Sequence, residues 1–141
     1  LVQTMDIMPT ILDLAGVPIP GTVEGTSLLT QDHREYLYGE HWEGDFATRM
    51  VRDDRYKLIY YAVGNKFQLF DLSTDPREIY DLAESTDHST VLKKLSDILI
   101  SNLYGSDLEW VIDGQLVGLP EKPLPESTDR KLGGQRGIRF I

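Results

Sequence analysis

The chain contains no cysteine among its 141 residues. This absence excludes a disulfide framework, a metal site built from thiolates and a cysteine nucleophile. Long apolar runs are also missing, and no signal-peptide pattern of basic, apolar and small residues is found. We therefore expect no membrane partner.

Basic residues are scarce, with 14 Lys and Arg against 23 Asp and Glu and a formal charge of −9. Because nucleic-acid affinity depends on Lys and Arg neutralising phosphates, we expect no nucleic-acid partner. The apolar fraction of 40% and the charged fraction of 26% are those of a folded globular chain. The length fits one domain, and the start at Leu1 rather than Met suggests a piece of a longer protein.

A helical pattern occupies residues 4–16, "TMDIMPTILDLAG". Asp6 is the better N-cap, because it places Pro9 in the first turn, where a missing N–H costs nothing. Gly16 fits the left-handed position just past the end. The apolar stripe of this predicted helix consists of Met8, Ile11, Leu12 and Ala15.

The pattern then changes to strands, in "REYLYGEHW", "ATRMVRDD", "YKLIYYAV" and "FQLFDL". Such short spacings favour hairpins, so an antiparallel meander is expected. A helix over residues 86–104, ended by Gly105, would cover one face with Val91, Leu92, Leu95, Leu99 and Leu103. The predicted fold class is α+β: a four-stranded antiparallel sheet with a long helix packed on one face, an N-terminal helix and an extended C-terminal tail. Asp113 and Gly114 predict a two-residue hairpin before that tail.

The segment "FQLFDLSTDPREIYDLA", residues 67–83, is rich in carboxylates: Asp71, Asp75, Glu78 and Asp81. They do not follow the calcium-loop pattern of alternating Asp and Asn with a central Gly. Asp75 and Pro76 predict a turn that starts a helix, with Glu78 near its N-terminus. The residues expected to point inward are Ile79, Leu82 and Ala83. We interpret this acidic run as structural and expect no metal ligand in the chain.

Four motifs, in order, carry a resemblance to a known family: "VQTMDIMPTILDLAGVPIPGTVEGTSLL", "YGE", "RMVRDDRYKLIYY" and "QLFDLSTDPREIYDLAE". Over residues 2–84 the chain resembles the C-terminal region of sulfatases, in the alkaline phosphatase superfamily. The tail "GGQRGIRF" is similar to the ends of some bacterial arylsulfatase-like members. Asp81 departs from the family, which commonly has Asn before Leu-Ala.

The resemblance implies hydrolysis of sulfate esters by a formylglycine, made from a Cys/Ser-x-Pro-x-Arg motif, and a calcium ion held by Asp and Asn. The family carries both in an N-terminal catalytic domain, and this sequence has no such motif. We therefore expect no catalytic residue, metal or cofactor in this chain, which would be inactive alone. Calcium and formylglycine are expected in the full-length enzyme.

The resemblance also divides the chain into three parts. Residues 1–30 would be a helix and linker at the edge of the catalytic domain, residues 31–105 the C-terminal subdomain, and residues 106–141 a hairpin and an extended tail. The expected partners are the enzyme's own N-terminal catalytic domain and a sulfate-ester substrate. Without that domain, the first helix would expose an apolar surface through which the chain could self-associate.

The segment "YGEHWEGDF" supplies the main candidate site. We predict that His41 and Trp42 line the substrate pocket, because a strand end entering a Gly-containing loop commonly presents side chains to a ligand. The alternative is that Trp42 caps the sheet core and His41 is simply exposed. Arg49 is a further candidate for binding sulfate oxygens, together with Arg52. The alternative for both is ion pairing on the strand face with Glu40, Asp53 or Asp54.

Two other functions fit the same sequence. One is a free-standing interaction module whose sheet or tail docks on a partner. The other is the C-terminal part of a related phosphodiesterase or phosphonate hydrolase, because those enzymes share similar C-terminal regions.

Overall fold

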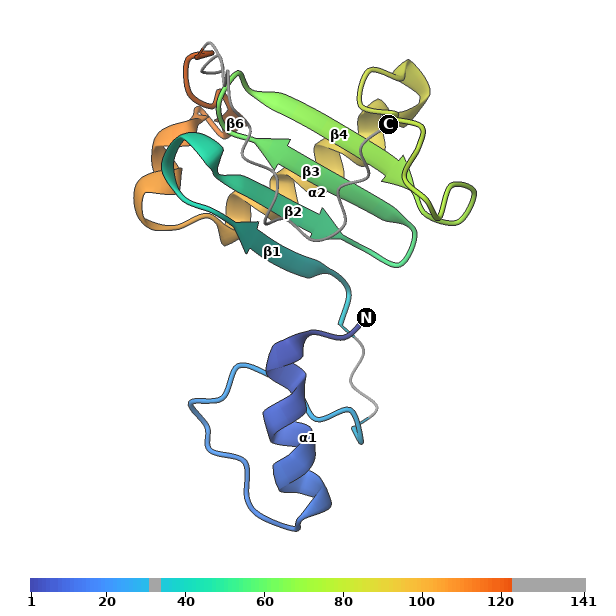
Figure 1. The fold of residues 1–141 in the computed structure, drawn as a ribbon, viewed down its shortest axis with the longest axis vertical. Helices are drawn as coiled ribbons and strands as arrows, with labels where there is room; N and C mark the ends of the chain where they lie inside the picture. The colour runs from blue at the N-terminus through green and yellow to red at the C-terminus, as the bar shows by residue number, and fades with distance from the viewer. Residues whose placement is uncertain (31–33, 123–141) are drawn as a thin grey trace, which may run out of the picture.

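The computed structural model describes residues 1–30 and 34–122, and the tail expected beyond residue 122 lies outside the described residues. Figure 1 shows a small N-terminal part around α1 and a larger part in which a four-stranded sheet lies against α2. This is the α+β architecture predicted from the sequence. Within the described ranges, no helix is both long and apolar enough to cross a membrane.

The N-terminal part begins with a 3-10 turn, η1 (Thr4–Asp6), which continues into α1 (Ile7–Leu14). Asp6 directly precedes α1, as expected. Its carboxylate, however, accepts a hydrogen bond from the N–H of Gln3 at 2.8 Å instead of capping the first turn of α1. Gly16 has a φ of +67° just past the helix, as predicted.

The apolar side of α1 faces solvent. Its exposed apolar side chains, with those of the turn before it, are Met5, Ile7, Met8, Ile11 and Leu14. Figure 1 shows α1 standing apart from the sheet, so the main core does not cover this side. The exposed apolar surface expected from the sequence is present, and we call these five side chains the α1 apolar face.

The sheet is a meander in which the spatial order of the strands equals their order in the chain. Its strands are β1 (Leu37–His41), β2 (Thr48–Arg52), β3 (Tyr56–Tyr61) and β4 (Lys66–Asp71), all antiparallel to their neighbours. Alternation along β2 places Val51 and Arg49 on one face, both buried. Val51 pairs with Leu58, which pairs with Leu69, so this face carries the core.

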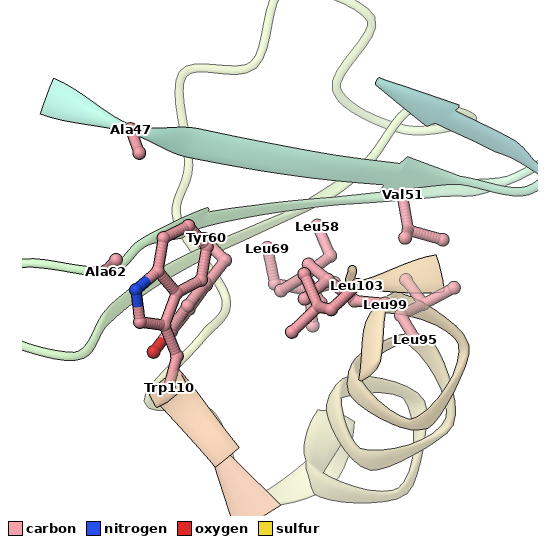
Figure 2. Close-up of a cluster of buried hydrophobic side chains, with 10 residues drawn as sticks. All are labelled: Ala47, Val51, Leu58, Tyr60, Ala62, Leu69, Leu95, Leu99, Leu103 and Trp110. Carbon is pink, nitrogen blue, oxygen red and sulfur yellow. The ribbon is translucent and has the colours of Figure 1, made fainter. Parts of the chain in front are cut away.

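Helix α2 (Ser89–Asn102) covers that face. Leu95 and Leu99 are one turn apart and fully buried, and burying each contributes about 1.5–3 kcal/mol. Figure 2 shows the core cluster of Ala47, Val51, Leu58, Tyr60, Ala62, Leu69, Leu95, Leu99, Leu103 and Trp110. The predicted helical register is confirmed.

The end of α2 differs from the prediction. The helix ends at Asn102, and Gly105 instead begins a 3-10 helix, η4 (Gly105–Trp110). Leu103 is extended, which turns the chain away before Gly105 is reached. As a result η4 runs back under the sheet and carries Trp110 into the core.

A short hairpin follows, with β5 (Val111–Ile112) and β6 (Gln115–Leu116). Asp113 and Gly114 form its turn with φ of +49° and +73°, so the predicted two-residue turn is confirmed. The chain then returns to the main sheet, where the N–H of Leu119 donates to the carbonyl of Ala62 at 2.7 Å.

Candidate functional site

The loop between β1 and β2 presents three aromatic rings to solvent. His41 ends β1, Trp42 follows it, and Phe46 ends a 3-10 turn, η2 (Gly44–Phe46). The ring centroids of His41 and Trp42 are 5.9 Å apart, those of Trp42 and Phe46 are 6.5 Å apart, and both pairs meet edge to face. The exposed fractions are 66% for Trp42 and 63% for Phe46. Trp42 therefore does not cap the sheet core, and we call residues 41–46 the aromatic loop.

The backbone of Trp42 is held in an unfavourable conformation. Its φ is +59°, in the left-handed region that bulky side chains rarely adopt. This geometry costs on the order of 1–2 kcal/mol relative to the right-handed region. The carbonyl oxygen of Trp42 accepts a hydrogen bond of 3.1 Å from Nη1 of Arg49, which supports the strained turn from below.

Arg49 is buried beneath the aromatic loop, with 2% of its surface exposed. Its Nε donates to Oδ2 of Asp107 at 2.7 Å, and its Nη1 also donates to the carbonyl of Thr48 at 3.0 Å. The guanidinium carbon lies 5.1 Å from the ring centroid of Trp110, in a cation–π arrangement. A buried charge is costly unless it is paired, and here both the pair and its hydrogen bonds are provided.

Electrostatics keep Arg49 charged. Burial alone would lower the pKa of Arg49, but the hydrogen bond and the charge of Asp107 outweigh burial and raise that pKa above its ordinary value. Glu40, with an oxygen 4.0 Å from Nε of Arg49, acts in the same direction. Glu40 also accepts a hydrogen bond of 3.1 Å from the hydroxyl of Tyr104, which raises the pKa of Tyr104.

The structure brings the three predicted site residues together. His41 and Trp42 are neighbours in the aromatic loop, and Arg49 binds the carbonyl of Trp42 from the buried side. Arg52 lies on the opposite face of β2, because it is three positions further along the strand than Arg49. Asp53, one of the suggested partners, instead accepts a hydrogen bond of 3.0 Å from Lys94.

The suggested ion pair of Arg49 with Glu40 is present at 4.0 Å, but sequence reasoning missed the nearer partner, Asp107. Arg49 and Asp107 are 58 positions apart, and Asp107 belongs to the unpredicted helix η4. One signal was present: alternation with Val51 places Arg49 on the core face, where an arginine requires a buried acceptor. Phe46 was also missed, because a single aromatic residue in a loop carries no periodic signal.

The acidic run of residues 67–83 makes local hydrogen bonds. Asp75 Oδ2 accepts from the N–H groups of Ile79 at 2.7 Å and Tyr80 at 2.8 Å. Asp81 Oδ1 accepts from the N–H of Leu69 at 3.0 Å, which fastens the run to β4. Asp71 and Glu78 form ion pairs with Arg55 and Lys57. In the part of the chain that the structure describes, no group of three or more His, Asp or Glu residues could hold a metal ion.

The prediction of a helix after Pro76 is wrong, because residues 76–85 contain no helix. Asp75 takes up the N–H groups that would begin the helix, and Glu78 has a φ of +56°, which breaks any helical run. Ile79 is consequently exposed instead of pointing inward. Leu82 and Ala83 do pack against the core, as expected.

The meander, its covering helix and the exposed aromatic loop define a small α+β subdomain. The sequence matches the family described as "N-sulphoglucosamine sulphohydrolase, C-terminal" over residues 1–103, and the chain belongs to this family. This family assignment confirms the resemblance to sulfatases that the sequence motifs indicated.

Individual relatives agree with this family. An arylsulfatase of Clostridium perfringens is 34% identical over 132 residues, which cover 88% of this chain and 27% of the arylsulfatase. A Delta 4,5-hexuronate-2-O-sulfatase of Bacteroides thetaiotaomicron is 37% identical over 100 residues, covering 63% of this chain and 21% of the relative. The chain thus spans about a quarter of the length of these curated relatives.

Solved structures show the same fold. A 2-O GAG sulfatase is similar with a TM-score of 0.61 and 33% identity, covering 67% of this chain and 23% of that one. A phosphonate monoester hydrolase from Silicibacter pomeroyi is similar with a TM-score of 0.57 and 27% identity. The similarity covers 71% of this chain and 24% of the hydrolase. The fold therefore occurs in sulfatases and in a hydrolase of another ester class.

Proposed function

We propose that the full-length protein hydrolyses sulfate esters and that this chain is its C-terminal subdomain, which completes the substrate pocket. Family membership and the identities of 34% and 37% to named sulfatases support the reaction class. The observation that carries the pocket role is the exposed aromatic loop, where Trp42 keeps 66% of its surface accessible in a strained conformation. Exposed strain of this kind is characteristic of ligand-contacting sites.

Each predicted residue has a chemical task in this proposal. The indole face of Trp42 stacks on a ring of the substrate, and His41 donates a hydrogen bond to a sulfate or hydroxyl oxygen. In this proposal Arg49 supports the pocket from beneath the loop, through its hydrogen bond to the carbonyl of Trp42, and does not bind sulfate oxygens directly, because only 2% of its surface is exposed.

The residues described here do not fit the family's catalytic groups. Formylglycine requires a Cys or Ser in the Cys/Ser-x-Pro-x-Arg motif, which the sequence lacks. The described residues contain no cluster of three or more His, Asp or Glu suited to a metal. We therefore assign calcium and formylglycine to the N-terminal catalytic domain of the full-length enzyme, and we propose that this chain alone is inactive.

The α1 apolar face is the surface that we propose for contact with that catalytic domain. It exposes five large apolar side chains on one helix and its preceding turn, while the sheet core is formed elsewhere. Burying such a surface against a second domain would be favourable at roughly 25 cal/mol per Å² of apolar area.

The test is hydrolysis of 4-nitrophenyl sulfate by the full-length protein and by this chain alone. We expect turnover only by the full-length protein, with KM raised roughly tenfold in His41→Ala and in Trp42→Ala. A control variant, Lys66→Met, breaks the exposed ion pair with Glu121 and should leave KM unchanged. Unchanged kcat/KM in both aromatic-loop variants would contradict the pocket role, and turnover by the chain alone would contradict its inactivity.

The second candidate is hydrolysis of phosphonate monoesters. The similarity to the Silicibacter pomeroyi enzyme, at 27% identity, favours it as the runner-up. The same assay with a phenylphosphonate monoester separates the two, because the preferred substrate will have the higher kcat/KM.

A further inference from the structure

A buried ion pair connects the aromatic loop to a helix that is distant in sequence. Arg49 lies on β2 and Asp107 on η4, and the distance from Nε to Oδ2 is 2.7 Å. The side chains of Arg49 and Asp107 expose only 2% and 5% of their surfaces. Removing both charges from water is costly, so the pair needs further hydrogen bonds to be stable at this position.

The remaining hydrogen bonds of Arg49 go to the aromatic loop and its border. Nη1 donates to the carbonyl oxygens of Trp42 at 3.1 Å and of Thr48 at 3.0 Å. Because Asp107 fixes Nε, the planar guanidinium can rotate very little, and Nη1 is directed at the carbonyl of Trp42. The orientation of that carbonyl is coupled to the left-handed conformation of the same residue.

We propose that Arg49, fixed by Asp107, is a positioning residue that holds Trp42 in its left-handed conformation and thereby presents the indole ring to the substrate. This inference rests on the proposed function, in which Trp42 contacts the substrate. Arg49 acts through Trp42 and does not itself touch the ligand, since almost none of its surface is accessible.

A comparison within the sheet supports a specific role. Arg55 and Asp71 form another Arg–Asp pair, with Nη2 and Oδ2 2.8 Å apart. Arg55 keeps 56% of its side chain exposed, and its guanidinium donates to Asp71 through Nε and Nη2. An ion pair that only stabilises the sheet therefore needs neither burial of the arginine nor a bond to a loop carbonyl.

The experiment is a double-mutant cycle in the full-length protein with 4-nitrophenyl sulfate. Arg49→Lys keeps a positive charge beside Asp107 but loses the planar fork that reaches Trp42. We expect it to raise KM roughly tenfold and to change kcat by less than about twofold. In the Trp42→Ala background, the same Arg49→Lys change should have no further effect on KM, because the ring that it positions is already absent. Arg55→Lys is the matched control and should leave KM unchanged.

The outcomes distinguish this inference from the proposed function. If Trp42→Ala leaves KM unchanged, the proposed contact with substrate fails, and this inference fails with it. If Trp42→Ala raises KM but Arg49→Lys does not, or if the two effects multiply, only the positioning role is overturned. Equal KM values for Trp42→Ala and the double variant support it.

A second measurement covers the case in which Arg49→Lys does not fold. 5-Fluorotryptophan is incorporated into this chain, whose only tryptophans are Trp42 and Trp110, and the signals are assigned with Trp42→Phe. In the ¹⁹F NMR spectrum, an indole ring of Trp42 that is held in one position should give one resonance, with a chemical shift different from that of the unfolded chain. Asp107→Asn should move this chemical shift toward the value of the unfolded chain. A resonance of Trp42 at the unfolded position in the unmutated chain would overturn the inference.

Discussion

Asp6 and Arg34 join the N-terminal helix to the approach of β1, with 2.6 Å between Oδ1 and Nη2. The same oxygen accepts the N–H of Thr26 at 3.0 Å, and the other carboxylate oxygen accepts the N–H of Gln3. Asp6 is 2% exposed, so one buried carboxylate organises three separate segments. We therefore expect the stability of the N-terminal part to depend on pH.

The first prediction concerns acid. Burial alone would raise the pKa of Asp6, but backbone hydrogen bonds from Thr26 and Gln3 and the charge of Arg34 outweigh burial and lower it. A carboxyl whose folded pKa lies below its unfolded value contributes stability at neutral pH. That contribution decreases as the pH falls below about 4. As the pH is lowered, we expect the Thr26 amide to lose its protection against hydrogen exchange, relative to the intrinsic rate at each pH, before the amides of the sheet do.

The corresponding variant is Asp6→Asn, which removes the negative charge that pairs with Arg34 and one of the two acceptor oxygens. The expected cost is about 1–3 kcal/mol for the local structure, measured as faster exchange of the Thr26 amide. The amide of Leu69, within the main sheet, should be unaffected and serves as the internal control. Unchanged protection of Thr26 would show that the carboxylate does not hold this part together.

The second prediction uses two glycines with nearly the same backbone conformation. Gly118 has a φ of +62° and Gly105 a φ of +59°. A Cβ atom at Gly118 would collide with the carbonyl oxygen of Ala62, whereas a Cβ at Gly105 meets nothing within 4 Å. Gly105→Ala should therefore cost only the left-handed penalty, on the order of 1 kcal/mol.

Gly118→Ala should cost about 1–3 kcal/mol more, because the return of the chain to β3 must shift to relieve the collision. Urea denaturation of both variants measures the difference directly. Equal free energies of unfolding would mean that the contact between Gly118 and Ala62 can relax without cost.

The third prediction concerns Asp81. Its Oδ1 accepts the N–H groups of Leu69 at 3.0 Å and Ala83 at 2.9 Å. An asparagine carbonyl can accept both bonds, so Asp81→Asn should change the free energy of unfolding by less than about 0.5 kcal/mol. Asp81→Ala should cost about 1–2 kcal/mol, because the N–H of Leu69 loses its acceptor. Equal effects of the two substitutions in thermal unfolding would argue against this role.

The main sheet and α2 could be predicted because each has a long, regular apolar period. Leu95 and Leu99 repeat at the helical spacing, and Leu58 and Tyr60 at the strand spacing. The segment after Pro76 could not be predicted, because Asp75 captures the N–H groups of Ile79 and Tyr80 locally, and this competition leaves no periodic signal.

The candidate site was predictable only in part. His41 and Trp42 were chosen as candidates because a strand end followed by Gly-containing sequence is a local pattern. The pairing of Arg49 with Asp107 depends on how η4 folds back beneath β2, which is a property of the tertiary structure. The sequence therefore indicated which side chains could contact a ligand, while the structure shows what supports them.

The fourth prediction concerns the α1 apolar face. Ile11 and Leu14 are 58% and 69% exposed on the same side of the helix, and such surfaces are unfavourable in contact with water. We expect the isolated chain to self-associate with increasing concentration in sedimentation velocity experiments. Ile11→Glu combined with Leu14→Glu should reduce that association, because it would place charges inside the contact.

The matched control for this face is Leu108→Glu, since Leu108 is also exposed but lies on η4 in the other part of the molecule. It should leave the association unchanged. If the α1 apolar face contacts a catalytic domain as we propose, the same double substitution should lower the melting temperature of the full-length enzyme. Loss of self-association together with an unaltered melting temperature of the full-length enzyme would separate the two roles. The helix would then be a contact between copies of the chain and not the junction with the catalytic domain.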